Sequence, residues 1–93
     1  MIGNGRDLVI QVKKYIEASV PVNTVYDIIV NNILYDLESN KQYWIGNNIN
    51  YSRIIKQYEQ MLEDFREYVK KDASGKEKIE KIETLLNQLK PSE

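Results

Sequence analysis

A chain of 93 residues with 42% hydrophobic residues, 29% charged residues and a formal net charge of −1 has the composition of one small globular domain. It contains no cysteine and no histidine, which excludes disulfides, thiolate nucleophiles and the commonest general base and metal ligand. We therefore expect a protein that is not an enzyme and that holds neither a metal ion nor a cofactor.

Apolar residues recur with the period of an α-helix in four stretches, which predict helices over residues 6–19, 24–39, 52–71 and 75–90. The apolar faces contain Leu8, Val12 and Ile16, then Val25, Ile29 and Ile33, then Ile55, Leu62 and Phe65, and last Ile79, Ile82 and Leu86. Short connections and the absence of a linker favour an all-α fold, a compact four-helix bundle that forms a single domain over residues 1–93.

Polar residues that precede these helices predict how they begin. Asn4 and Asn23 are of the type that caps a helix N-terminus. Ser74 with Glu77 three residues later has the pattern of a capping box, in which each side chain bonds the other residue's backbone N–H.

The connection over residues 40–51 is longer than the others. Tyr43-Trp44-Ile45 and Ile49-Asn50-Tyr51 flank Gly46-Asn47-Asn48, an arrangement typical of a small β-hairpin. We expect either an irregular segment or such a hairpin.

Carboxylates are the only numerous groups that chemistry could use. Glu59, Glu63 and Glu67 follow one another at four-residue spacing on one face of the third predicted helix. That face lies away from the apolar stripe, so we interpret the three carboxylates as a solvated surface rather than a metal site. No pattern indicates a small-molecule ligand.

The stretch between Glu38 and Glu59 contains no acidic residue but does contain cations, aromatic rings and amides. Aromatic residues and arginine are enriched where proteins contact one another, so this stretch predicts a partner-binding surface. Its candidate contact residues are Lys41, Tyr43, Trp44, Asn47, Asn48, Tyr51 and Arg53. Alternatively, Tyr43 and Trp44 fold back to cap the end of the bundle while the asparagines satisfy turn geometry.

Three apolar residues fall outside the predicted core faces. Ile28 and Tyr35 lie seven residues apart on the side of the second helix opposite its main stripe, and Ile10 points away from the stripe of the first. They indicate either contact with another chain or a second helix that is surrounded on all sides within the bundle.

Two short motifs resemble those of a known family. Trp44-Ile45-Gly46 lies near the middle of the chain and resembles the turn motif of the small Trp-x-Gly substrates of type VII secretion systems. Tyr68-Val69-Lys70-Lys71-Asp72 is similar to their export signal. The resemblance implies a secreted dimer of helical hairpins, although Pro21 interrupts what would be the first long helix of such a hairpin.

The sequence thus favours a non-catalytic helical module for protein–protein interaction, an accessory subunit or adaptor in the cytoplasm whose partner is another protein or a second copy of itself. No apolar run is long enough to indicate a membrane partner. The alternatives are the secreted dimer and a nucleic-acid-associated protein that uses the basic and aromatic residues of 41–56.

Overall fold

The computed structural model describes the backbone of residues 5–91 and the side chains of residues 8–91. In this part the chain forms only helices, with no strand. They are α1 (Gly5–Glu17), α2 (Val22–Tyr35), a π-helical turn η1 (Asp36–Asn40), α3 (Lys41–Gly46), α4 (Ser52–Tyr68) and α5 (Gly75–Leu89). The predicted all-α fold is confirmed, and α1, α2, α4 and α5 form the predicted four-helix bundle. The predicted cap at Asn4 lies outside the described residues.

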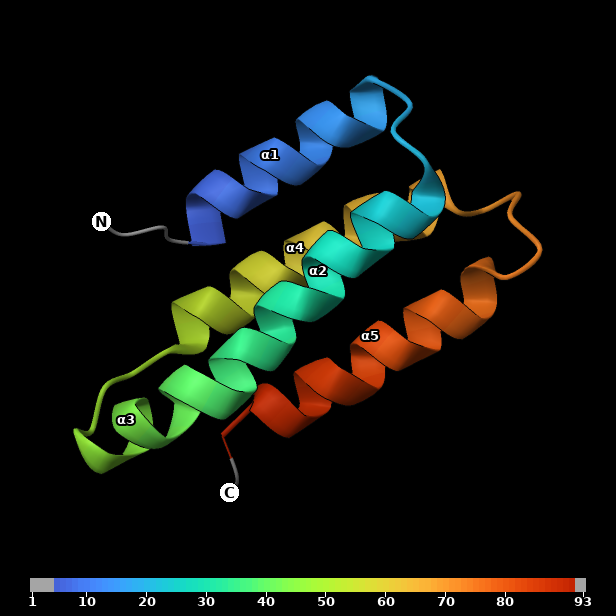
Figure 1. The fold of residues 1–93 in the computed structure, drawn as a ribbon. Helices are drawn as coiled ribbons and strands as arrows, with labels where there is room; N and C mark the ends of the chain where they lie inside the picture. The colour runs from blue at the N-terminus through green and yellow to red at the C-terminus, as the bar shows by residue number, and fades with distance from the viewer. Residues whose placement is uncertain (1–4, 92–93) are drawn as a thin grey trace.

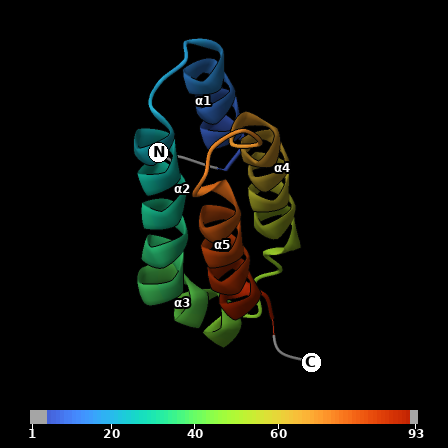
Figure 2. The same ribbon diagram turned by 90° about the vertical axis from the view of Figure 1, so that its right-hand side faces the viewer.

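The four main helices alternate in direction along the chain. Figure 1 shows α1 and α4 running one way and α2 and α5 the other way. Figure 2 shows α1 and α5 on opposite sides of the pair formed by α2 and α4. α1 contacts α4 more extensively than α2, although α2 follows α1 directly in the sequence. α4 therefore has a neighbour on each side, α1 on one and α5 on the other.

α1 ends in a backbone turn that determines where α2 begins. Ser19 has a φ of 60°, its N–H donates to the Ile16 carbonyl (3.0 Å), and the Val20 N–H donates to Tyr15 (3.0 Å). This is the Schellman arrangement, which terminates a helix in a left-handed residue. Pro21 follows and itself precedes the first residue of α2. The predicted cap at Asn23 is wrong, because the fixed φ of Pro21 starts the helix two residues earlier.

The predicted capping box at the start of α5 is also wrong. Ser74 occupies the capping position but makes no capping hydrogen bond, because its hydroxyl donates to Asp72 Oδ1 (3.0 Å). The Ser74 N–H donates to the same oxygen (2.8 Å). The bond from the Ser74 N–H, and after it the bond from the Ser74 hydroxyl, hold the pKa of Asp72 below its ordinary value. An aspartate turn therefore replaces the capping box.

The core contains apolar side chains from every main helix. Its fully buried members are Val12, Val25, Ile29, Ile33, Met61, Phe65, Ile82 and Leu89. Tyr26 of α2 packs against the Phe65 ring with 6.3 Å between ring centroids. No helix in the described part of the chain combines the length and the apolar composition required to cross a bilayer.

The hairpin implied by the Trp-x-Gly resemblance is not the fold of this chain. The chain turns after Gly46, as the motif implies, but it also reverses between α1 and α2 and between α4 and α5 (Figure 1). Four helices share one core, because each carries an apolar stripe that a two-helix hairpin would leave half uncovered.

The turn before α5 packs so closely that it should tolerate only glycine. A Cβ atom on Gly75 would lie 2.5 Å from the Val69 carbonyl oxygen, whereas one on Gly46 would meet nothing within 4 Å. We expect Gly75→Ala to lower the free energy of unfolding by about 1–3 kcal/mol. The matched variant Gly46→Ala should leave it unchanged or raise it by up to about 1 kcal/mol. Urea unfolding followed by circular dichroism measures both, and equal stabilities would contradict the packing of this turn.

Candidate protein-interaction site

The segment after α2 continues as helix instead of forming a loop. The Lys41 N–H donates to the carbonyl of Asp36, five residues earlier, which is the bond of a π turn. α3 follows directly and includes Tyr43, Trp44 and Ile45, which the hairpin alternative placed in a strand. The prediction of a hairpin at 40–51 is therefore wrong. Helical hydrogen bonds continue from η1 into α3, and the described part of the chain contains no strand with which residues 43–45 could pair.

α3 ends in a second Schellman arrangement. The Ile49 N–H donates to the Trp44 carbonyl (2.8 Å), the Asn48 N–H donates to Ile45 (3.2 Å), and Asn48 has a φ of 55°. Asparagine tolerates this left-handed conformation better than most residues. The Asn47 side chain donates to the Tyr43 carbonyl (2.8 Å). Both amides that we predicted as contact residues thus also shape the turn, and both remain exposed.

The inner side of this segment caps the C-terminus of α5. The Lys41 ammonium donates to the carbonyls of Gln88 (2.5 Å) and Lys90 (3.3 Å). The Tyr51 hydroxyl donates to the carbonyl of Leu89 between them (2.9 Å). The last carbonyls of a helix lack partners within the helix and carry partial negative charge, so a cation and a hydroxyl are favourable here.

Tyr51 and Trp44 form the apolar part of this cap. Their rings lie 5.0 Å apart between centroids with an interplanar angle of 29°. Tyr51 is only 4% exposed, and Trp44 is half-buried against the core. The expectation that Tyr51 contacts a partner is corrected, because its ring is covered and its hydroxyl already has an acceptor. The predicted folding back of the segment holds for Trp44 but not for Tyr43.

A partly buried hydrogen bond attaches η1 to α4. The Tyr58 hydroxyl donates to Asp36 Oδ2 (2.5 Å), and Asp36 Oδ1 accepts a bond from the Asn40 side chain (2.7 Å). Burial raises the pKa of Tyr58 well above that of a free tyrosine, and the bonded, charged carboxylate of Asp36 raises it further. The π turn is therefore held at both ends, by Asp36 and by Lys41.

Four large apolar side chains in and beside this segment are exposed. Tyr35 is 63% exposed and Tyr43 62% exposed, and Ile45 and Ile49 are exposed as well. We name Tyr35, Tyr43, Ile45 and Ile49 the aromatic end, because they belong to the last residue of α2, to α3 and to the turn after α3, and α3 lies at one end of the bundle (Figure 1). Ile45 and Ile49 were not predicted as contact residues, since their spacing suggested paired strands.

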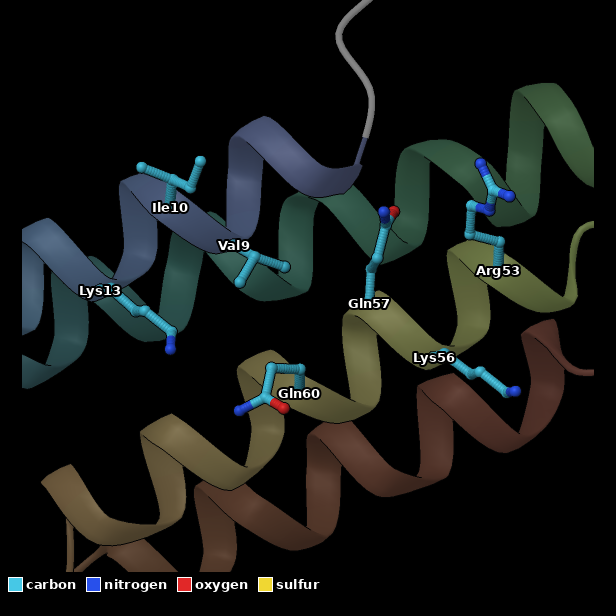
Figure 3. Close-up of a pocket in the computed structure, with 7 residues that line it drawn as sticks. All are labelled: Val9, Ile10, Lys13, Arg53, Lys56, Gln57 and Gln60. Atoms are coloured by element: carbon cyan, nitrogen blue, oxygen red, sulfur yellow. The ribbon is translucent and has the colours of Figure 1, made fainter.

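The remaining predicted contact residues lie elsewhere. Ile28 is half-buried on α2. Ile10 (46% exposed) and Arg53, which are far apart in the sequence, line one groove between α1 and α4. Figure 3 shows this groove with Lys13 and Lys56, which sequence reasoning did not select as site residues. In the sequence, only the absence of acidic residues around Lys56 indicated a basic surface there.

The carboxylates of α4 form no cluster. Glu59, Glu63 and Glu67 are exposed, and Glu59 pairs with Lys90 at 3.2 Å. Among the residues that the structure describes, no group of three acidic side chains is placed to hold a metal ion.

Comparisons of the chain with family models, with curated proteins and with solved structures found no match.

The bond between Tyr58 and Asp36 predicts a loss of stability in alkali. Tyr58 ionises near pH 10 in the unfolded chain but stays protonated in the fold, so the folded state binds more protons and the free energy of unfolding falls as the pH rises above about 10. Tyr58→Phe should show a shallower fall. At pH 8 it should be about 1.5–3 kcal/mol less stable than the parent, because a hydrogen bond to a charged group is lost.

Urea unfolding at pH 8, 10 and 11 measures both effects. Tyr43→Phe removes an exposed hydroxyl and should keep the parent's stability at pH 8. A Tyr58→Phe protein with the same stability and the same pH dependence as the parent would show that this bond does not hold η1.

Proposed function

We propose that this protein is a non-catalytic interaction module that docks on a larger protein in the cytoplasm, as an accessory subunit or adaptor, through the aromatic end. One observation supports this most directly. Of the five large hydrophobic residues that are exposed in the described part of the chain, four lie between residues 35 and 49. Isolated exposed apolar residues are ordinary, whereas a group of them in one region marks a surface that another molecule covers.

The composition of the aromatic end fits a protein partner. Tyrosine rings offer large contact areas with few rotatable bonds, and they are enriched among residues that dominate binding energies. Gln42, Asn47 and Asn48 are exposed beside them and can donate and accept hydrogen bonds at the rim.

The nucleic-acid alternative has less support. It needs exposed rings for base stacking and free cations for phosphates. Of the three rings proposed for it, Tyr51 is buried and Trp44 stacks on Tyr51, which leaves Tyr43. The Lys41 ammonium is engaged by the carbonyls of α5.

The double variant Tyr35→Ser/Tyr43→Ser tests the proposal. A tagged protein expressed at its native level is purified from its own cells, and bound proteins are quantified by mass spectrometry. We expect one near-stoichiometric partner with the parent protein and its loss with the double variant. With the purified partner, calorimetry should show at least about a 100-fold weaker affinity, since each ring at an interface centre contributes about 2 kcal/mol.

Gln42→Ser is the matched control, because Gln42 is exposed on α3 next to Tyr43 but is polar. It should keep the partner and most of the affinity. Equal thermal unfolding of the three proteins shows that the fold is intact. A parent protein that is monomeric and recovers no partner, or a double variant that retains full affinity, would disprove docking through the aromatic end.

A further inference from the structure

A groove lies between α1 and α4, away from the aromatic end. Its volume is about 440 Å³, and most of its lining surface is apolar. The lining residues are Val9, Ile10 and Lys13 of α1 and Arg53, Lys56, Gln57 and Gln60 of α4. In Figure 3, Val9 and Lys13 leave α1 on the side of α4, whereas Ile10 points away from α4 at the rim.

The charged residues that line this groove all have one sign. Lys13, Arg53 and Lys56 line it, and no carboxylate does. Lys13 forms an ion pair with Asp64, which is not among the lining residues; the Asp64 Oδ2 atom lies 3.9 Å from the Lys13 ammonium. In the described part of the chain, neither Arg53 nor Lys56 forms an ion pair. The protein thus has a local excess of positive charge, although its formal net charge is −1.

A second groove, between α4 and α5, is lined by charges of both signs. Glu59, Glu63 and Glu83 line it together with Lys90, which pairs with Glu59 at 3.2 Å, and Glu83 also pairs with Arg66 at 3.0 Å. Of these two grooves, only the one between α1 and α4 is lined by charges of a single sign. A groove lined by cations and no carboxylate favours negatively charged ligands.

We propose that the groove between α1 and α4 binds an acidic amphipathic helix of a partner protein. Apolar side chains of that helix would cover Val9, Ile10 and the methylene stems of Lys13 and Lys56, and its carboxylates would reach the ammonium and guanidinium groups. Two neighbouring helices that leave an apolar groove are the usual receptor for an amphipathic helix. This inference goes beyond the proposed function, because it concerns a different surface.

A second copy of this chain fits the groove less well. A two-fold symmetric contact would place the same three cations opposite one another, which costs binding energy. A contact between the basic groove of one copy and the groove between α4 and α5 of the next would bring two hollow surfaces together, and these do not fill each other. The apolar lining likewise suits a helix better than a phosphate backbone, which offers no apolar side chains.

The probe is a fluorescently labelled synthetic helix of about 15 residues, four turns, with leucines on one face and glutamates on the rest. Three competitors are compared with it: the same peptide with lysines for glutamates, the same peptide with serines for leucines, and oligothymidylate. Fluorescence anisotropy with the full-length chain should show saturable binding to the probe that weakens several-fold between 50 and 500 mM salt. The lysine peptide should not compete, and the serine peptide should compete at least about tenfold less well.

Two charge-matched variants locate the binding site. Lys13→Glu/Arg53→Glu/Lys56→Glu reverses the groove, and we expect at least a tenfold loss of affinity. Lys71→Glu/Lys76→Glu/Lys81→Glu has the same net charge but changes exposed lysines outside the groove, and it should bind within about twofold of the parent. Ile10→Ser should weaken binding without changing its salt dependence. Equal thermal unfolding of the variants excludes loss of the fold.

Several results would overturn the inference. If the serine peptide competed as well as the probe, the groove would be only a charged patch. If oligothymidylate bound more tightly than the probe, the ligand would be a nucleic acid. Equal losses of affinity in both triple variants, or self-association that depends on the same three cations, would also contradict the inference. The variant Tyr35→Ser/Tyr43→Ser should bind the probe like the parent. Because this variant tests the aromatic end and the triple variants test the groove, failure of this inference can be distinguished from failure of the proposed function.

Discussion

The structure depends above all on how the last carbonyls of α5 are satisfied. Lys41 and Tyr51, on either side of α3, donate to the carbonyls of Gln88, Leu89 and Lys90. A helix end left without such donors is unfavourable when it is shielded from water. The same contacts attach the segment between α2 and α4 to the C-terminal end of α5. They therefore both close this end of the bundle and fix the orientation of α3.

The orientation of α3 divides its residues into two sets. The π turn changes the rotation of the helical path, and the hydrogen bond between Tyr58 and Asp36 holds that turn against α4. Trp44 consequently stacks on Tyr51 in the cap, while Tyr43 beside it in the sequence stays exposed. Neighbouring residues of a helix point in different directions, so one short helix both stabilises the fold and exposes two residues of the aromatic end, Tyr43 and Ile45.

Charge is distributed around the bundle with less symmetry than the composition suggests. Lys13, Arg53 and Lys56 line the groove between α1 and α4 without a carboxylate, whereas carboxylates and Lys90 together line the groove between α4 and α5. The apolar stripe of α4 occupies only one part of its circumference, which leaves its flanks for charged residues. A net charge of −1 thus conceals one groove whose lining charges are all positive.

The sequence by itself determined the four main helices, because a 3.6-residue apolar period is a local property that survives in any compact arrangement. It also determined that chemistry that requires a cysteine or a histidine side chain is excluded, since both residues are absent, and it indicated residues 40–51 as a candidate contact segment. Only the tertiary structure decided which of these residues are available. Tyr43 and Tyr51 are equivalent by residue type, yet one is exposed and the other is buried. Likewise, Ile10 and Arg53 share a groove only because α1 packs beside α4. Burial and proximity depend on contacts between segments distant in the chain, and no local pattern records those contacts.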